Sequence, residues 1–185
     1  MEVRPTTRDA LILAARDLTV ERGWDSVRMA DVATRAGVSR QTVYNEFRGR
    51  AGLAEALAVS EVERFARRVR AALFANGADA RAGCYAGILI TLEDATRNPL
   101  VRGIVTSGHG GLLPYLTIRS DIVLAAAGAV LTEWADVYLP TTPPDTVKLA
   151  VESVIRLTVS HIMLPTDTPA ATAAALAEVF VRLLR

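Results

Sequence analysis

The sequence predicts an all-α protein, and three observations support this fold class. Apolar residues make up 51% of the 185 residues but aromatic residues only 5%, and Ala, Leu and Val are abundant, which favours helices over a sheet sandwich. The apolar residues recur with the 3.6-residue spacing of amphipathic helices, and no segment alternates with period two for long enough to predict a strand. Gly and Pro residues separate these periodic segments from one another.

The first predicted helix covers residues 8–22. Gly23 is a typical helix-terminating glycine, and we expect Trp24 and Val27 to pack back against the helix as an apolar plug. The apolar residues that lie mostly on one face of this helix, the face expected to be buried, are Ala10, Leu11, Ala14, Leu18 and Val20.

Two short helices follow, over residues 28–36 and 39–46, with Gly37 between them. Glycine readily forms the turn that ends a helix, and Ser39 is a favourable N-cap for the next one. The small side chain of Ala33 lets the two helices cross closely, and Val38 packs beneath the turn. Two short helices joined in this way form a helix-turn-helix.

A longer fourth helix is expected over residues 51–74, because no Pro or Gly follows Gly52 until the Asn76-Gly77 break. We place the domain boundary at its start, which gives one domain at residues 1–50 and a second at residues 51–185. Further helices are expected near residues 79–97, 98–106, 118–139, 145–164 and 168–184, separated by breaks rich in Gly and Pro.

Composition and motif content exclude several classes of function. The single cysteine, Cys84, can form neither an intrachain disulfide nor a thiolate metal site. The two histidines, His109 and His161, are far apart, and no nucleophile elbow, phosphate loop or metal-ligand spacing is present, so we expect no enzyme, no cofactor and no metal. Without the apolar core of a signal peptide or a stretch of roughly 20 apolar residues, the chain is expected to be a soluble cytoplasmic protein.

The distribution of charge, rather than its total, points to nucleic acid as a partner. The net charge is only +1, but residues 1–70 carry 13 Arg against 10 acidic residues, whereas residues 71–185 carry 8 basic and 10 acidic residues. The N-terminal residues of the second helix of a helix-turn-helix reach base edges and phosphates in the major groove. There, Arg reads guanine, and Gln or Asn reads adenine. We therefore expect the helix at residues 39–46 to bind double-stranded DNA.

The same region resembles the N-terminal signature of the TetR family of transcriptional regulators. The matching pattern is Ala33-x-x-Ala36-Gly37-Val38-Ser39-x-x-Thr42-x-Tyr44-x-x-Phe47 followed by Arg50-x-x-Leu53, and Gly23-Trp24 fits the family's glycine–aromatic pair. The resemblance covers roughly residues 8–57. It implies an N-terminal three-helix helix-turn-helix DNA-binding domain and a C-terminal helical domain for ligand binding and dimerisation.

The resemblance also implies roles for individual residues. Thr42 and Tyr44 match positions that touch the DNA backbone, although Tyr44 could instead be a half-buried packing residue. Arg40, Gln41 and Asn45 match variable positions that read bases. The full set of candidate DNA-binding residues is Arg28, Ser39, Arg40, Gln41, Thr42, Tyr44, Asn45, Arg48 and Arg50.

Arg28 departs from the family pattern, because many members have Thr or Ser there as the N-cap of the first motif helix. Either Ser26 caps this helix instead or the helix begins differently, and Arg28 could itself reach a phosphate. Farther along, Arg64, Arg67, Arg68 and Arg70 form a charged run on the fourth helix, for which a solvated face is the simpler interpretation.

The C-terminal half carries no motif of its own. Wide apolar stripes on the last two predicted helices favour a homodimer interface, which the resemblance also implies, although some of these residues must equally belong to the intramolecular core. The middle helices are mostly apolar with few polar groups, which suits a small lipophilic effector, and His109 lies in a Gly-rich loop that either covers such a pocket or is a plain loop. The candidate ligand-binding residues, most of which could equally be packed core, are Phe65, Tyr85, Leu89, Leu92, Leu112, Tyr115, Trp134 and Tyr138.

The sequence thus predicts a TetR-type regulator that acts as a repressor. It is expected to bind palindromic operator DNA as a dimer, and the resemblance implies that it leaves the operator when a small ligand binds. The alternative is a helical adaptor protein that has lost DNA binding, but the polar residues of the helix at 39–46 argue against it.

Overall fold

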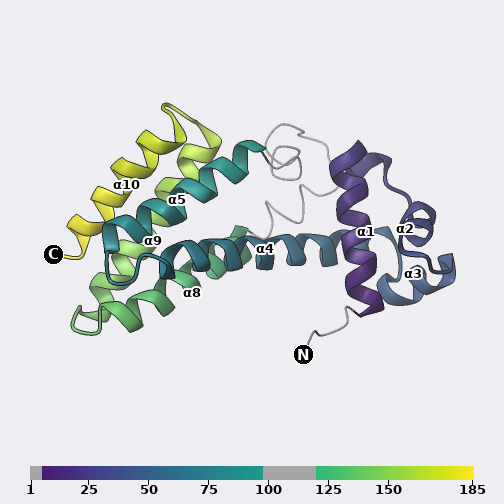
Figure 1. The fold of residues 1–185 in the computed structure, drawn as a ribbon, viewed down its shortest axis with the longest axis horizontal. Helices are drawn as coiled ribbons and strands as arrows, with labels where there is room; N and C mark the ends of the chain where they lie inside the picture. Colours follow the sequence, from purple (N-terminus) through teal and green to yellow (C-terminus); the bar gives the residue numbers. More distant parts are fainter. Residues whose placement is uncertain (1–5, 98–119) are drawn as a thin grey trace. The chain divides into compact units, whose positions relative to one another are not determined.

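The computed structural model describes residues 6–97 and 120–185, and this part of the chain is helical without strands (Figure 1). The predicted all-α fold class is therefore confirmed. The described residues divide into two compact units, one ending at Glu61 and the other made of residues 62–97 and 120–185. The predicted helix at 98–106, together with His109, Leu112 and Tyr115, lies outside the described residues.

Helix α1 (Thr7–Arg22) starts at a capping box and ends at Gly23, which has φ 80°. The backbone N–H of Asp9 donates to the Thr6 hydroxyl over 3.2 Å, and the backbone N–H of Thr6 donates to the Asp9 carboxylate over 3.0 Å. These bonds satisfy donors that the first helical turn would otherwise leave unpaired. The Thr6 hydroxyl donates to the Asp9 carboxylate over 2.8 Å, and this bond, together with the one from the Thr6 backbone N–H, lowers the pKa of Asp9 below its ordinary value.

One apolar residue of α1 does not lie where we predicted it. Val20 is 42% exposed, whereas Leu11 is fully buried. Val20 follows Leu11 by nine residues, which at about 100° per residue puts it on the opposite side of the helix. The prediction that Val20 belongs to the buried face was therefore wrong.

The helix-turn-helix forms as predicted from helices α2 (Met29–Ala36) and α3 (Arg40–Phe47). Gly37 adopts the left-handed conformation, with φ 68°, and Ser39 caps α3 by accepting a hydrogen bond from the backbone N–H of Thr42 over 3.0 Å. The short helix η1 (Trp24–Ser26) precedes α2 and turns Trp24 into the core. The core of this unit consists of apolar side chains from α1, η1, α2, α3 and the start of α4, among them Leu11, Leu18, Trp24, Val32, Val43, Phe47, Leu53 and Leu57.

Helix α4 (Arg50–Phe74) begins at a tight connection to α3. Arg48 and Gly49 have φ values of 56° and 136°, so both lie in the region that favours glycine. Gly52 allows the closest approach, because a Cβ at this position would lie 2.0 Å from the backbone oxygen of Phe47. The first turns of α4 pack into the N-terminal core, and the division between the units therefore falls after Glu61, beyond the boundary we expected at residue 50.

The second unit contains the rest of α4 together with helices α5 (Ala80–Arg97), α8 (Ser120–Tyr138), α9 (Pro144–Met163) and α10 (Pro169–Leu183). Helices α5, α9 and α10 pack against one another, and α8 packs against α9 (Figure 1). An aromatic cluster lies at the core: Trp134 contacts Tyr138 and Phe180 at centroid distances of 5.7 and 6.5 Å. The predicted ends of these helices agree with the observed ones to within two residues.

Ion pairs connect α4 to its neighbours in this unit. Arg68 pairs with Asp94 of α5 at 2.5 Å, and Arg70 pairs with Glu133 of α8 through both carboxylate oxygens. The Arg70 hydrogen bonds lower the pKa of Glu133. At least these two arginines of the charged run therefore join helices rather than forming a purely solvated face.

Candidate nucleic-acid interface and ligand groove

Helix α3 has one buried face and one exposed polar face. Val43 is fully buried and Phe47 nearly so, as the four-residue spacing predicted. The opposite face exposes Arg40, Gln41 and Asn45, all of which we proposed as base-reading residues. The structure thus brings these three candidates together on one solvent-facing surface of the helix.

Hydrogen bonds between neighbouring turns order this surface. The Gln41 side-chain amide donates to the Asn45 side-chain oxygen over 2.9 Å, and the Arg40 guanidinium lies over the Tyr44 ring, 5.4 Å from its centroid. The Gln41 amide keeps one N–H and its oxygen for a base edge, which is the pattern that adenine accepts in the major groove. Tyr44 is 37% exposed, so its hydroxyl is accessible to a phosphate while the ring supports Arg40.

Two further exposed arginines, Arg28 and Arg48, lie beside the ends of the motif helices. Arg28 occupies the N-cap position of α2 through its backbone alone: its N–H donates to the Asp31 carboxylate over 3.2 Å, and its carbonyl oxygen accepts from the backbone N–H groups of Asp31 and Val32. The helix therefore begins at Met29 without a cap from Ser26, which lies in η1. Neither guanidinium has an ion-pair partner among the described residues, so both can meet a phosphate.

Arg50 is held more tightly than the other candidates. Its guanidinium donates to the backbone oxygen of Trp24 over 2.7 Å and lies 4.9 Å from the centroid of the Trp24 ring. A carboxylate oxygen of Asp25 lies 4.0 Å away. These contacts connect the start of α4 to η1, so Arg50 supports the turn whether or not it also meets DNA.

The structure identifies three arginines that hold the motif and that sequence reasoning missed. Arg8 of α1 donates to the backbone oxygen of Glu46 over 3.2 Å and lies over the Phe47 ring. Its positive charge stabilises the carboxyl end of α3, where the helix dipole is negative. Arg35 of α2 makes a bidentate pair with Glu21 of α1, with both bonds at 2.8 Å, and so lowers the pKa of Glu21. Arg22 of α1 pairs with Asp31 of α2.

Most of the ligand-binding candidates lie in the core of the second unit. Trp134 is fully buried and donates through its ring nitrogen to the backbone oxygen of Gly77 over 3.0 Å. Leu92 is buried, and four partly buried candidates pack against the same core: Phe65, Tyr85, Leu89 and Tyr138. The structure brings these six together as a packed cluster, and their role in ligand binding stays a prediction.

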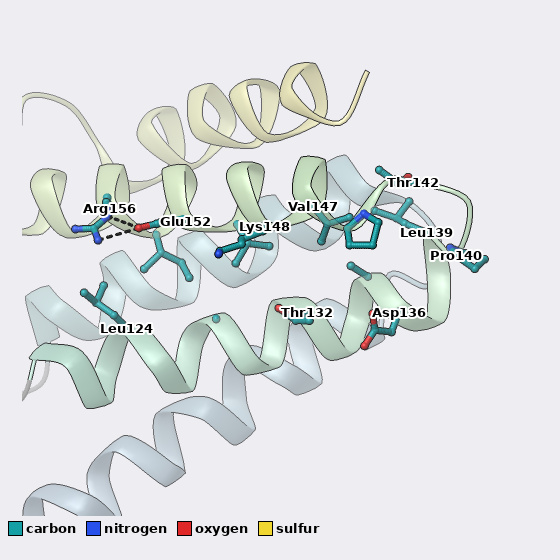
Figure 2. Close-up of a pocket in the computed structure, with 15 residues that line it drawn as sticks. Leu124, Thr132, Asp136, Leu139, Pro140, Thr142, Val147, Lys148, Glu152 and Arg156 are labelled. Carbon is teal, nitrogen blue, oxygen red and sulfur yellow. Dashed lines mark hydrogen bonds and ion pairs between the residues drawn. The ribbon is translucent and has the colours of Figure 1, made fainter.

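A groove lies elsewhere in the second unit, between α8 and α9, and none of the predicted ligand residues lines it (Figure 2). Its volume is about 660 Å³. Apolar side chains from both helices form its floor, and Asp136, Lys148, Glu152 and Arg156 lie around it. Sequence reasoning had no signal for this groove, because its lining residues carry no motif and come together only through the packing of α8 against α9.

Within the described residues, no group of His, Cys, Asp and Glu side chains is arranged to hold a metal ion. Cys84 is buried, and burial raises the pKa of its thiol to about 12. No helix in residues 6–97 and 120–185 is long and apolar enough to cross a membrane.

Comparison with known proteins extends these findings over nearly the whole chain. Residues 11–57 match the family described as bacterial regulatory proteins, tetR family, and residues 79–182 match the bacterial tetracyclin repressor, C-terminal domain. The HTH-type transcriptional regulator AlkX of Mycobacterium tuberculosis is 33% identical over 94% of this chain and 83% of that protein.

Solved structures agree with this assignment. The TetR family repressor AlkX from Dietzia sp. strain DQ12-45-1b, implicated in biodegradation of n-alkanes, is 31% identical and superposes with a TM-score of 0.78 over 99% of this chain and 97% of that chain. RolR in complex with resorcinol is 22% identical with a TM-score of 0.62, over 93% of this chain and 86% of that chain, and shares the fold.

Proposed function

Because the chain belongs to the TetR family of transcriptional regulators and binds DNA through its helix-turn-helix, we propose that it is a repressor that a small lipophilic ligand releases from a palindromic operator. Like its relatives, which are transcriptional regulators, it is a regulator and not an enzyme. The observation that carries the proposal is the exposed polar face of α3, where Arg40, Gln41 and Asn45 are free to meet base edges.

Two copies of the chain bind the operator in this proposal. A single recognition helix reads only a few base pairs, and a two-fold dimer matches a palindrome of two half-sites. We propose that the dimer forms through α9 and α10. Leu149 and Met163, which are 58% and 61% exposed, lie on one face of α9 about four turns apart. Small residues on α10 that allow close helix approach are exposed as well: Ala171, Ala174 and Ala175.

The ligand acts by shifting a population of conformations. In the binding conformation, the two α3 helices are spaced one turn of DNA apart, about 34–36 Å, and enter successive major grooves. A ligand that prefers a conformation with a different spacing draws the protein off the operator in proportion to its preference. Helix α4 contributes residues to both units and is the covalent connection through which the shift travels.

The similar repressor from Dietzia is implicated in biodegradation of n-alkanes, which supports a lipophilic effector for this chain. We infer that the products of the regulated genes act on aliphatic compounds. Binding takes place in the cytoplasm, where the operator lies.

The dimer part of the proposal is tested by the mass of the complex with DNA. Light scattering after size exclusion is expected to give two protomers, and the variant Leu149→Glu, Met163→Glu is expected to give one and to lose operator affinity. A matched control is Leu13→Glu on α1, because Leu13 is also exposed, at 43%, but lies outside the proposed interface. A wild-type monomer that binds a palindrome as tightly as expected for a dimer would contradict the proposal.

A further inference from the structure

The groove between α8 and α9 is long. It extends along α8 from Leu124 to the end of the helix beside Leu139, which at 1.5 Å per residue is roughly 20 Å. Along α9 its lining runs from Pro144 to Arg156 (Figure 2). This length suits an extended chain better than a compact ring.

Small residues on α8 keep the groove open. A Cβ at Gly128 would meet only the Ile155 Cδ1 atom, at 4.0 Å, so a larger side chain there would enter the groove. Val147 and Val151 of α9 form apolar parts of the floor on the opposite side. An apolar floor with polar groups at its edge is typical of small-molecule sites.

Some of the charged side chains at the groove have an ion-pair partner among the described residues, and others have none. Arg156 and Glu152 pair with each other at 2.9 Å. Lys148, one turn before Glu152 on α9, is exposed and has no ion-pair partner among the described residues. Asp136 of α8 also lines the groove without an ion pair in this part of the chain, and it would oppose an anion near Lys148.

We propose that this groove is the effector site and binds an aliphatic acid, with the chain on the apolar floor and the carboxylate beside Lys148. This inference rests on the proposed function and adds the place and chemistry of the ligand. It differs from the sequence-based candidates, which lie in the packed core of the same unit. The groove is open on one side, so an extended chain can enter without unfolding the helices.

The test measures binding of dodecanoate and dodecanol to the full-length protein by calorimetry, because the two probes share a chain and differ in the charge of the head. The wild type is expected to bind dodecanoate more tightly than dodecanol. Gly128→Leu is expected to weaken both at least tenfold by filling the groove. Its matched control, Ala129→Leu, adds the same side chain at the next, exposed position of α8 and is expected to bind as the wild type does.

Head-group variants test the role of Lys148. Lys148→Met is expected to weaken the binding of dodecanoate by about two- to fivefold, the range of an exposed ion pair, and to leave the affinity for dodecanol unchanged. Lys148→Arg is expected to keep the wild-type affinity for dodecanoate. Asp136→Asn is expected to raise that affinity by about twofold, since the substitution removes the opposing charge. Because both positions are exposed, these variants report on the proposal even if Gly128→Leu fails to fold.

Several results would overturn the proposal. They are no dodecanoate binding by the wild type, equal binding by Gly128→Leu and Ala129→Leu, or equal loss of both probes in Lys148→Met. A change of oligomeric state in Gly128→Leu without loss of dodecanoate binding would show that a second copy covers the groove instead. Operator binding without ligand is measured in parallel, so a wild type that binds DNA but not dodecanoate refutes only the groove, whereas failure to bind any operator refutes the proposed function.

Discussion

Gly52 allows α4 to begin directly against the end of α3, and Gly52→Ala tests this close approach. The new Cβ would lie 2.0 Å from the backbone oxygen of Phe47 and 3.1 Å from its carbonyl carbon. Contacts of this kind are almost never shorter than 3.0 Å, so the two backbones must separate by about 1 Å. Phe47 is 4% exposed, and its displacement disturbs the N-terminal core.

The magnitudes favour a net loss of stability. Replacing Gly by Ala within a helix contributes up to about 1 kcal/mol of stability. Forcing a backbone shift in a packed core costs about 1–3 kcal/mol and more where it opens a void, so we expect a net loss of about 1–2 kcal/mol. Operator affinity is expected to fall at least tenfold, because the shift displaces Arg48 on the turn and Tyr44 in the last turn of α3.

Chemical denaturation followed by circular dichroism measures the first effect, and fluorescence anisotropy with labelled operator measures the second. The matched control is Gly87→Ala in α5, where a Cβ would meet side-chain atoms at 3.5 Å, an ordinary contact. This control is expected to be as stable as the wild type or more so. If Gly52→Ala matches the control in both measurements, the reasoning about the α3–α4 turn is refuted.

Other variants test separate parts of the account. Ser39→Ala removes the α3 cap and is expected to cost about 1 kcal/mol in denaturation experiments, whereas Ser39→Asp keeps a cap acceptor but weakens DNA binding by its charge, and equal stability of all three proteins would contradict the capping role. Gln41→Met removes the amide that Asn45 orders and is expected to abolish the preference at one base pair of each half-site, costing about 1–3 kcal/mol in affinity for the preferred site, as sequencing of selected sites would reveal. Hydrogen bonds from Arg35, Arg70 and Arg182 lower the pKa values of Glu21, Glu133 and Glu178, so their stabilising contribution is fully present above the unfolded value near 4.5 and is lost as the pH falls through the folded values. The midpoint temperature of thermal unfolding is therefore expected to be constant near neutral pH and to fall below about pH 4.5. It is expected to fall less steeply with pH in Glu21→Gln, and an unchanged pH dependence in this variant would contradict the assignment. Burial raises the pKa of the Cys84 thiol to about 12, so iodoacetamide is expected to modify it only after denaturation, and rapid modification of the folded protein would contradict that burial.

The elements that could be predicted from the sequence are those defined by local signals. The turn at Gly37 and the cap at Ser39 depend only on residues a few positions apart, and both formed as predicted. The exposed face of α3 followed from the four-residue spacing of Val43 and Phe47 in the same way.

The features that could not be predicted depend on contacts distant in sequence. Arg8 and Glu46, or Arg35 and Glu21, carry no sequence pattern that pairs them, and only the packing of α1 against the motif helices brings them together. Aromatic residues such as Trp134 were candidates for a pocket because they are apolar residues of the middle helices, but the same property equally favours a packed core. The α8–α9 groove depends on how α8 and α9 pack against each other around Gly128. The spacing of apolar residues in the sequence does not predict this packing.

The central claim is that the exposed face of α3 reads a specific operator, and selection of binding sites from random duplex DNA tests it most directly. The purified protein is expected to enrich a palindrome whose half-sites are one helical turn apart, with an affinity that falls steeply with salt. The triple variant Arg40→Ala, Gln41→Ala, Asn45→Ala is expected to remain folded and to lose the enrichment. Enrichment of the same palindrome by this variant, or no enrichment by refolded wild-type protein freed of any bound ligand, would contradict the account.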